Sequence, residues 1–506
     1  MKTLAKYHKW ISIIFTLFIV LFSISGIVLN HRNLLSGIDL NRSLLPKEFS
    51  YNNWNNAAVK STLRINSDSV LIYGNIGVWL TDNKFTNYSD FNHGFPQGID
   101  NRKVNKIIQT NHNKLLAGTL FGLYQFKSGK WERLDLPVKK ERISDLIVKE
   151  DTVFVLTRSY LLKTKDLKHF ETITLPPPVN YDNKIGLFKT LWVIHSGEIY
   201  GEAGKLLVDI VGLIMMFLTI TGFILFVNRL VLKKRKKIVR SKRRKIKRSN
   251  KFLLKWHNKI GWTTLVLLII TSSTGIFLRP PFLISIVNTK VSKIPFSELD
   301  TDNAWFDKLR RVMYDDETHR YLVSTSEGMF YSDDNFKSEL KTFRIQPPIS
   351  IMGLNVFEKI ESQKYLIGSF EGLFLWDAGT GYVFDLITNN SYQRPKAKSR
   401  PIGQYLISGF TRDYHGEITF FDYNIGAHTI SGNPFPKMPE NIQKQPISLW
   451  NTALEIHTGR IFQSLLKDFY ILIVPLTGIA LLFILISGFI VWFKCFRKKR
   501  KKIKNE

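Results

Sequence analysis

Residues 255–278 read KWHNKIGWTTLVLLIITSSTGIFL, and residues 6–29 read KYHKWISIIFTLFIVLFSISGIVL. The two stretches align without a gap, with His8 on His257 and a small-residue step before a glycine near each end. Each contains an apolar run of the length that crosses a bilayer, about 20 residues. The repeat indicates that the chain contains two copies of one membrane unit.

Four segments are long and apolar enough to cross a membrane: residues 11–30, 206–228, 260–278 and 469–493. The second and fourth are also related, because LWVIHSGEIYGEAGKLL (191–207) matches ALEIHTGRIFQSLLKDF (453–469). A cleaved signal peptide is the alternative for the first segment, but its near copy lies mid-chain, where no signal peptide acts. We therefore expect a four-helix membrane bundle that arose by tandem duplication.

The chain of 506 residues has a net charge of +31. The position of the basic residues along the sequence indicates what kind of partner this charge serves. Basic runs at 233–248 and 496–504 directly follow apolar segments. This is the pattern of cytoplasmic loops in membrane proteins, so lipid is the expected partner and nucleic acid is excluded. Both termini are expected in the cytoplasm. A single cysteine excludes a disulfide framework.

Two long segments between the helices are expected outside the cytoplasm and carry β repeats. KLLAGTLFGLYQF (114–126) resembles RYLVSTSEGMFYS (320–332) and KYLIGSFEGLFLW (364–376), and weaker relatives recur every 40 to 45 residues. That period is typical of four-stranded propeller blades. With about three repeats in each half, the halves form either one six-bladed β-propeller or two separate β domains.

The predicted domain boundaries follow from these segments. They are helix 1 (1–31), first β half (32–190), outer extension with helix 2 (191–229), basic cytoplasmic loop (230–255), helix 3 (256–279), second β half (280–450), outer extension with helix 4 (451–495) and basic tail (496–506). The fold class is thus a membrane protein of the α+β type.

Five of the eleven histidines lie at the ends of the predicted spans: His8, His31, His195, His257 and His457. Any one of them alone could be an interfacial anchor. The duplication, however, places His8 with His257 on the inner side and His195 with His457 on the outer side. Two facing imidazoles can supply both axial ligands of a haem iron, which leaves no open position and favours electron transfer. The sequence therefore predicts two b-type haems.

Two glycines lie on the same helix face as the inner histidines. Gly26 follows His8, and Gly275 follows His257, by 18 residues, which is five whole turns. Small residues let a flat ligand or another helix approach closely. Helix–helix packing alone is the alternative role for these glycines.

Three further residues belong to the predicted outer side. His31 lies about 140° around its helix from His8. It could replace an outer ligand, contact a haem propionate, or receive an anionic substrate together with Arg279. Asp209 lies within about 40° of the face of His195. Its carboxylate is expected either to orient a histidine or to reach water near the interface.

Four motifs resemble the PepSY-associated transmembrane family, which includes bacterial ferrisiderophore reductases: YHKWISIIFTLFIVLFSISGIVLNH (7–31), IHSGEIYG (194–201), LKWHNKIGW (254–262) and IHTGRIF (456–462). The resemblance implies a haem-bearing helical bundle that reduces ferric iron in a siderophore or another chelate on the outer side. Carried over by motif, the axial ligands would be His8, His195, His257 and His457. The chain departs from the family outside the membrane, where it has blade-like repeats in place of PepSY modules.

The expected activity is therefore that of a membrane-bound oxidoreductase of the ferric reductase type, with no catalytic side chains beyond the haem ligands. The cytoplasmic segments are too short for a flavin or nicotinamide domain, and no G-x-G-x-x-G fingerprint follows a strand. The electron donor must then be separate: a soluble reductase, a flavin or quinol. The alternative is a membrane-anchored β-propeller for binding, assembly or sensing, without a cofactor.

Overall fold

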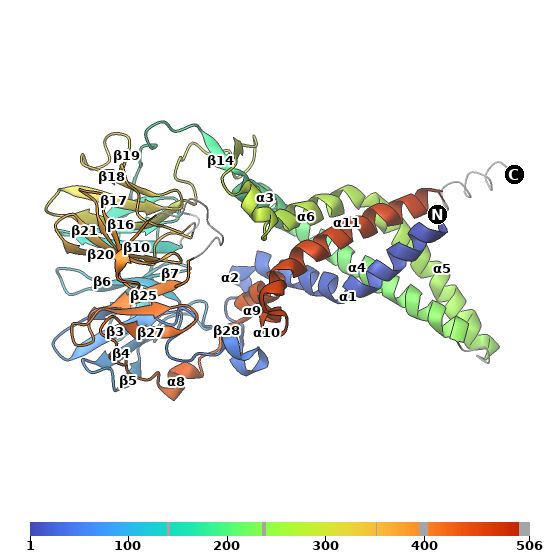
Figure 1. Cartoon of the computed structure of the whole chain (residues 1–506), viewed down its shortest axis with the longest axis horizontal. Helices are drawn as coiled ribbons and strands as arrows, with labels where there is room; N and C mark the ends of the chain where they lie inside the picture. Colours follow the sequence, from blue (N-terminus) through green and yellow to red (C-terminus); the bar gives the residue numbers. More distant parts are fainter. Residues whose placement is uncertain (139–141, 235–238, 351, 394–402, 495–506) are drawn as a thin grey trace. The chain divides into compact units, whose positions relative to one another are not determined.

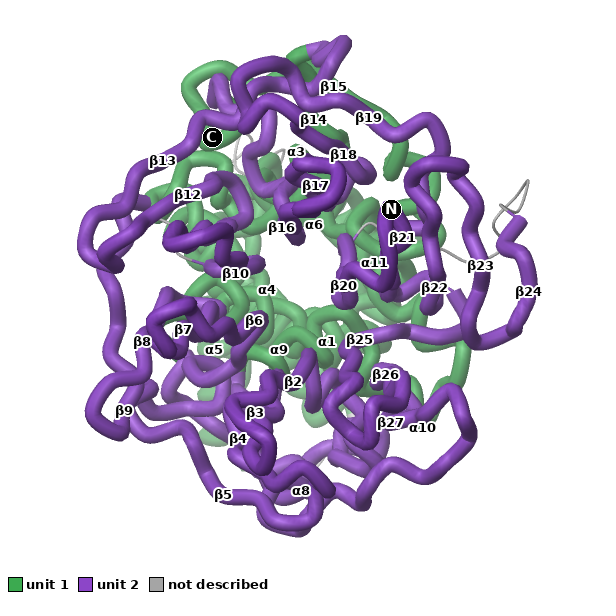
Figure 2. Tube along the Cα trace, turned by 90° about the vertical axis from the view of Figure 1, so that its left-hand side faces the viewer, with its two compact units in different colours: residues 1–35, 183–300, 450–506 green, residues 36–182, 301–449 purple. Residues whose placement is uncertain are grey.

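The computed structural model describes residues 1–138, 142–234, 239–350, 352–393 and 403–494 (Figure 1). The predicted basic tail and part of the basic loop lie outside these residues. The chain divides into two compact units (Figure 2). The helical unit comprises Met1–Leu35, Asn183–Asp300 and Trp450–Glu506, and the β unit comprises Ser36–Asp182 and Thr301–Leu449.

The helical unit contains three unbroken spans within the described residues: Lys2–Asn30, Glu198–Lys233 and Arg460–Trp492. The long helices in these spans are α1 (Lys2–Asn30), α4 (Gly201–Lys234) and α11 (Ile473–Trp492). The short helices are α2 (Arg32–Leu35), α3 (Leu187–Ser196), α7 (Phe282–Ile286), α9 (Leu449–His457) and α10 (Gln463–Leu466). Strands β14 (Lys184–Gly186) and β15 (Lys290–Ser292) pair in the same unit.

The prediction of four continuous spans is wrong at the third. That segment consists of α5 (Arg240–Thr263) and α6 (Leu265–Phe277), which meet at an angle of 68°. The hydroxyls of Thr263 and Thr264 both donate 2.9 Å hydrogen bonds, to the carbonyls of Lys259 and Ile260. Such back-bonding competes with the helix ladder and bends helices. Helices α5 and α6 make a fourth span only if they are counted together as one bent span.

The long helices pack through small residues and aliphatic side chains. Ile19, Val211, Leu268, Leu481 and Leu485 form a common core. A Cβ on Gly478 would lie 2.4 Å from the side chain of Ile276, so this glycine admits the neighbouring helix. Other apolar side chains on α1 and α4 remain exposed, as expected where lipid is the solvent.

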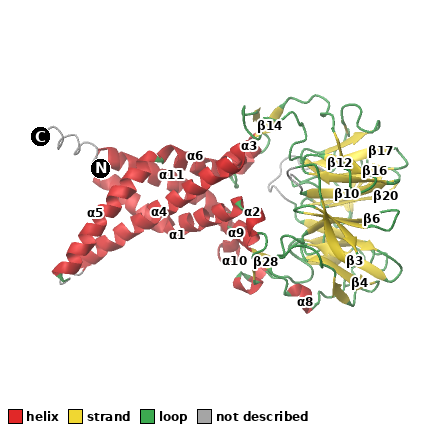
Figure 3. Ribbon diagram, turned by 180° about the vertical axis from the view of Figure 1, so that it is seen from behind, coloured by secondary structure: helices red, strands yellow, loops and turns green. Residues whose placement is uncertain are grey.

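The β unit contains six antiparallel sheets of three to five strands within the described residues. Helices predominate in one unit and strands in the other (Figure 3). The first three sheets come from the first half of the chain: β2 (Ser61–Arg64), β3 (Ser69–Gly74), β4 (Gly77–Asp82), β5 (Tyr88–Asp90); β6 (Val104–Gln109), β7 (Leu115–Thr119), β8 (Leu123–Lys127), β9 (Lys130–Leu134); β10 (Ile143–Lys149), β11 (Thr152–Thr157), β12 (Leu161–Thr164), β13 (Glu171–Ile173).

The other three sheets come from the second half: β16 (Leu309–Asp315), β17 (Arg320–Thr325), β18 (Met329–Ser332), β19 (Lys341–Thr342); β20 (Val356–Glu361), β21 (Lys364–Ser369), β22 (Gly372–Asp377), β23 (Val383–Asp385), β24 (Asn390–Ser391); β25 (Ile407–Thr411), β26 (Thr419–Asp422), β27 (Gly426–Thr429). Second strands such as β3 and β21 are buried almost throughout, which explains their continuous apolar runs. A separate short pair joins β1 (Asp39–Leu40) to β28 (Ile447–Ser448).

The sheets are arranged in a propeller-like manner. Their first strands, β2, β6, β10, β16, β20 and β25, gather around one axis (Figure 2). The first and last sheets adjoin, since the Phe410 amide donates a 3.2 Å hydrogen bond to the Lys60 carbonyl. The two halves therefore form one compact β unit, and the expectation of two separate β domains is wrong. Residues 183–190 and 280–300, which we assigned to the β halves, belong to the helical unit.

A buried ion pair joins the third and fourth sheets. Arg311 Nε lies 2.8 Å from Asp145 Oδ2, and both side chains are at most 10% exposed. The amide of Val312 donates a 3.0 Å hydrogen bond to the same oxygen. We expect Asp145→Ala to destabilise the β unit by about 3–5 kcal/mol, because it leaves a buried guanidinium without its counter-charge.

The measurement is the denaturation midpoint of the β unit, followed by tryptophan fluorescence. Glu361→Ala is the control, because it removes an exposed ion pair with Lys364 and is expected to cost less than about 1 kcal/mol. Equal midpoints for the two variants would contradict a structural role for the buried pair.

Candidate functional site: two histidine pairs in the helical unit

The inner pair consists of His8 on α1 and His257 on α5. His8 Nδ1 lies 3.1 Å from the Ile484 carbonyl and 3.1 Å from the Ser487 hydroxyl of α11. His257 Nδ1 lies 2.9 Å from the Thr221 hydroxyl of α4. Each imidazole is thus held by a helix distant in sequence.

The outer pair is formed by His195 and His457, which end α3 and α9. Their ring centroids lie 6.0 Å apart, with 52° between the ring planes. Both helices stop at a left-handed glycine: Gly197 has a φ of 80° and Gly459 a φ of 76°. That conformation favours glycine as a helix C-cap. The IHSG and IHTG motifs therefore end each helix immediately after its histidine.

The outer histidines are held as the inner ones are. His195 Nδ1 lies 3.0 Å from the Thr271 carbonyl and 3.3 Å from the Thr274 hydroxyl. The corresponding distances for His457 Nδ1 are 3.1 Å to the Phe22 carbonyl and 3.0 Å to the Ser25 hydroxyl.

One arrangement therefore recurs at all four sites. Each histidine contacts a Ser/Thr-Gly step, and in three of them Nδ1 also lies at the carbonyl three residues before that hydroxyl. A carbonyl only accepts, so in these three Nδ1 carries the proton and donates it. The neutral ring then has a lone pair on Nε2, which is the form that binds metals. With the proton on Nδ1, the free lone pair on Nε2 lies on the side of each ring away from the Ser/Thr-Gly step.

The glycine of each step makes room for an imidazole. A Cβ would lie 2.8 Å from His195 Cε1 at Gly275, 2.9 Å from His8 Cε1 at Gly488, 3.2 Å from His457 Cε1 at Gly26 and 3.6 Å from His257 Cε1 at Gly222. Gly26 and Gly275 thus contact the outer histidines. Gly26 shares α1 with His8, but Gly275 lies in α6 and His257 in α5. The predicted common face of Gly275 and His257 is therefore wrong, because the bend between α5 and α6 separates them. Helix–helix packing alone does not account for them.

The outer pair fits a haem with two protein ligands. Metal–imidazole bonds are about 2 Å long. Two rings on opposite sides of one metal therefore have centroids about 6 Å apart, as His195 and His457 do. Among the described residues, no group of three or more His, Cys, Asp or Glu side chains could hold a bare metal ion. A metal held by two imidazoles alone would take its remaining ligands from a macrocycle.

His31 has a different partner. Its Nε2 lies 2.6 Å from Asp209 Oδ2, and the Asn30 amide donates a 2.9 Å hydrogen bond to Asp209 Oδ1. Asp209 is 8% exposed, so it is buried and does not reach water as one alternative had it. Asp209 orients a histidine as predicted, but that histidine is His31 and not His195. With Nε2 bound to Asp209, His31 keeps only Nδ1 for a further contact.

Arg279, predicted on the outer side, follows α6 and is largely buried. Its Nε has no hydrogen-bond partner within the described residues. The neighbouring charges are Glu455 and Arg460, with Arg460 Nε 2.8 Å from Glu455 Oε2. The charge of Arg279 also acts on His457. Two arginines and one carboxylate thus lie close together, and Arg279 lies close enough to the outer pair for its charge to act on His457.

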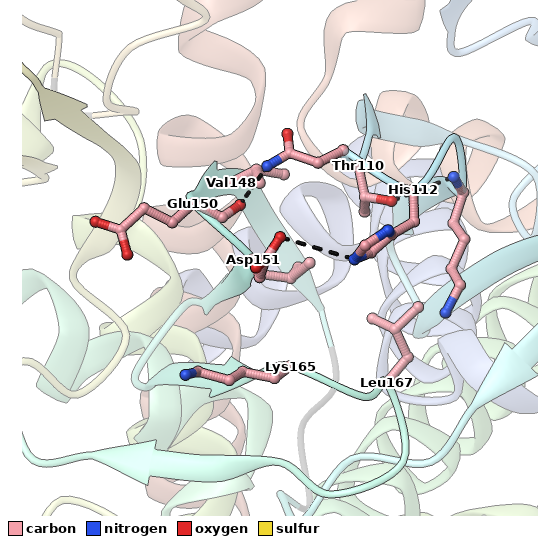
Figure 4. Close-up of a pocket in the computed structure, with 10 residues that line it drawn as sticks. Thr110, His112, Val148, Glu150, Asp151, Lys165 and Leu167 are labelled. Atoms are coloured by element: carbon pink, nitrogen blue, oxygen red, sulfur yellow. Dashed lines mark hydrogen bonds and ion pairs between the residues drawn. The ribbon is translucent and has the colours of Figure 1, made fainter.

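The β unit has a surface pocket between the β6–β7 and β10–β11 turns (Figure 4). It is lined by His112, Glu150, Asp151 and Lys165, among others. His112 Nε2 lies 3.7 Å from Asp151 Oδ1, and the two side chains are 70% and 68% exposed. Such an open, weak pair is typical of solvated turns.

Comparison with solved structures finds only distant similarity. The extracellular domain of a hybrid two-component system from B. thetaiotaomicron matches with a TM-score of 0.35 and 11% identity, covering 75% of this chain and 39% of that one. The WD40 β-propeller domain of Doa1 matches with a TM-score of 0.32 and 8% identity, covering 78% of this chain and 95% of that one. The chain thus spans well under half the length of the first of these structures.

No curated protein matches the chain by sequence. The family model described as the PepSY-associated TM region matches residues 5–494, which include all four paired histidines. Together with the three membrane-length helices, this match shows that the chain is a membrane protein and belongs to the PepSY-associated TM family.

Proposed function

We propose that this protein carries electrons across the bacterial cytoplasmic membrane through two bis-histidine b-type haems and reduces a ferric chelate, such as a siderophore, on the outer side. The observation that carries the proposal is the fourfold repeat of an imidazole bound at Nδ1 against a Ser/Thr-Gly step. Two of these imidazoles, His195 and His457, lie 6.0 Å apart between ring centroids, and the charge of His8 acts on His257.

The side chains around each pair suit this role. When bound, a haem supplies reversible one-electron chemistry at its iron. The hydrogen bonds at Nδ1 fix the ring orientation and make Nε2 more basic. Two histidines occupy both axial positions, which favours electron transfer over binding of other iron ligands.

The two pairs are spaced to bridge the bilayer. His8 lies near the start of α1. His457 contacts Ser25 of the same helix, which is 17 residues further along than His8. This separation corresponds to about 25 Å along the helix axis, which is most of the roughly 30 Å hydrocarbon core. The basic residues at the start of α5, the helix that carries His257, favour a cytoplasmic location for the His8–His257 pair, with both termini inside.

The electron donor and the acceptor are proposed from the residues at the two ends of the helical unit. A separate reductase, flavin or quinol delivers electrons at the His8–His257 end, since the described residues form no nucleotide-binding sheet. At the other end, the Nε of Arg279, which has no hydrogen-bond partner within the described residues, suits an anionic chelate or a haem carboxylate. The β unit, which we infer to be a six-bladed propeller, then lies outside the cytoplasm.

The test is a reduced-minus-oxidised absorption spectrum of the detergent-purified full chain, with a haem-to-protein ratio. We expect a b-type spectrum and two haems per chain. A colourless protein from haem-replete cells would refute the proposal. The propeller-like β unit favours one alternative in that case, a membrane-anchored binding, assembly or sensor protein.

A further inference from the structure

Basic side chains gather where the first strands of the β unit begin. Lys60 immediately precedes β2, Arg142 immediately precedes β10, Lys106 lies in β6 and Arg311 in β16. Because these strands surround one axis (Figure 2), residues far apart in sequence meet there. We call Lys60, Lys106, Arg142 and Arg311 the axial basic cluster.

Two members of the cluster have carboxylate partners. Arg311 is paired with Asp145 at 2.8 Å. The Lys106 ammonium lies 3.5 Å from Glu358 Oε1, and these two side chains are 20% and 38% exposed. The cluster therefore reaches solvent at this point.

Lys60 is bound differently. Its ammonium donates a 3.2 Å hydrogen bond to the neutral side-chain oxygen of Asn355. The Asn355 carbonyl in turn accepts from Arg311 at 2.8 Å, so a second cation lies close by. No carboxylate among the described residues forms an ion pair with Lys60.

The pKa of Lys60 reflects this environment. Burial, and after it the charges of Arg142, Arg311 and Lys103, together lower this pKa to about 8. Lys103 itself is paired with Asp100 at 2.7 Å. Below pH 8 Lys60 is charged in the folded protein, and its ammonium remains without a counter-charge. An unfolded lysine holds its proton to about pH 10.4, so this charge costs folding free energy at neutral pH.

We infer that the axial basic cluster binds a small polycarboxylate, with Lys60 as the principal contact. Within the cluster, Arg311 and Lys106 already form ion pairs with carboxylates of the protein. Lys60 lacks the equivalent partner, and a carboxylate from a ligand would supply it with a charge-assisted hydrogen bond. The site is separate from the histidine pairs, so its failure would leave the proposed electron transfer intact.

The experiment is isothermal titration calorimetry of the purified full chain with citrate at pH 8, in two buffers of different ionisation enthalpy. We expect binding accompanied by uptake of up to about half a proton, because an anion beside Lys60 raises its pKa. Burial lowers the pKa values of Lys106 and Arg311, but the nearby carboxylates outweigh it and raise both above their usual range, so both stay protonated at pH 8. Uptake at pH 8 therefore reports on Lys60.

Lys60→Met is expected to weaken citrate binding about 10- to 100-fold and to abolish the uptake. Lys60→Arg retains the charge, so it should bind citrate but take up no proton. Lys364→Met, which removes an exposed lysine of the same unit, should match the wild type. Melting temperatures of the variants identify any that are misfolded.

Gallium(III) citrate, which is redox-inert, distinguishes the two sources of a polycarboxylate. Tighter binding of the gallium complex assigns the site to a metal chelate, and tighter binding of citrate assigns it to the free acid. Absence of citrate binding to the wild type, or equal affinity of Lys60→Met, would overturn the inference. Inorganic phosphate binding as tightly as citrate would overturn the assignment to carboxylates.

Discussion

His8→Ala and His257→Ala are each expected to remove the same haem, and His195→Ala and His457→Ala the other. The haem-to-protein ratio should fall from two to one in every single variant, because an iron held by two axial histidines loses half of its protein ligands. Redox titration of the remaining absorption should give one midpoint potential for the inner variants and a different one for the outer variants.

Non-additivity within a pair makes this prediction sharper. His8→Ala combined with His257→Ala should cost no more haem than either change alone, since the two residues act as a unit. His8→Ala combined with His195→Ala should remove both haems. His31→Ala is the matched control: this histidine is bound to Asp209 and its loss should leave two haems. Unchanged spectra in all four single variants would instead show that the histidines are interfacial anchors.

Gly275→Ala and Gly488→Ala are expected to remove the haem of the histidine that each glycine contacts. The added Cβ would lie 2.8 Å from His195 Cε1 and 2.9 Å from His8 Cε1, closer than real Cβ contacts allow. Alanine normally favours a helix over glycine by about 0.5–1 kcal/mol. A loss of haem would therefore reflect displacement of the imidazole and not a weakened helix. The measurements are haem content and midpoint potential.

Substitutions at two other glycines test how the loss of haem depends on the distance between the added Cβ and its nearest neighbour. At Gly26 the Cβ would lie 3.2 Å from His457 Cε1, so Gly26→Ala should shift the outer potential with smaller loss of haem. At Gly261 the nearest side-chain atom belongs to Leu218, at 3.8 Å, which is ordinary contact. Gly261→Ala should keep both haems. Equal behaviour of Gly275→Ala and Gly261→Ala would contradict the role given to the Ser/Thr-Gly steps.

The sequence by itself determined the features that repeat locally. Apolar length predicted the membrane segments, and duplication paired His195 with His457, whose rings lie 6.0 Å apart in the structure. The 40- to 45-residue repeat predicted about three sheets in each half, and the structure has three in each. These properties follow from hydrophobic burial and strand period, which are written into neighbouring residues.

Only the tertiary structure decided which distant groups meet. His457 binds at Ser25, 432 positions away, and Asp209 binds His31 and not His195. The break at Thr264 also escaped prediction, because an apolar run reads the same in a straight or a bent helix. The uncompensated charge of Lys60 arises from residues of several sheets. Helical periodicity fixes the face on which a side chain lies, but packing between helices and between sheets fixes its partner.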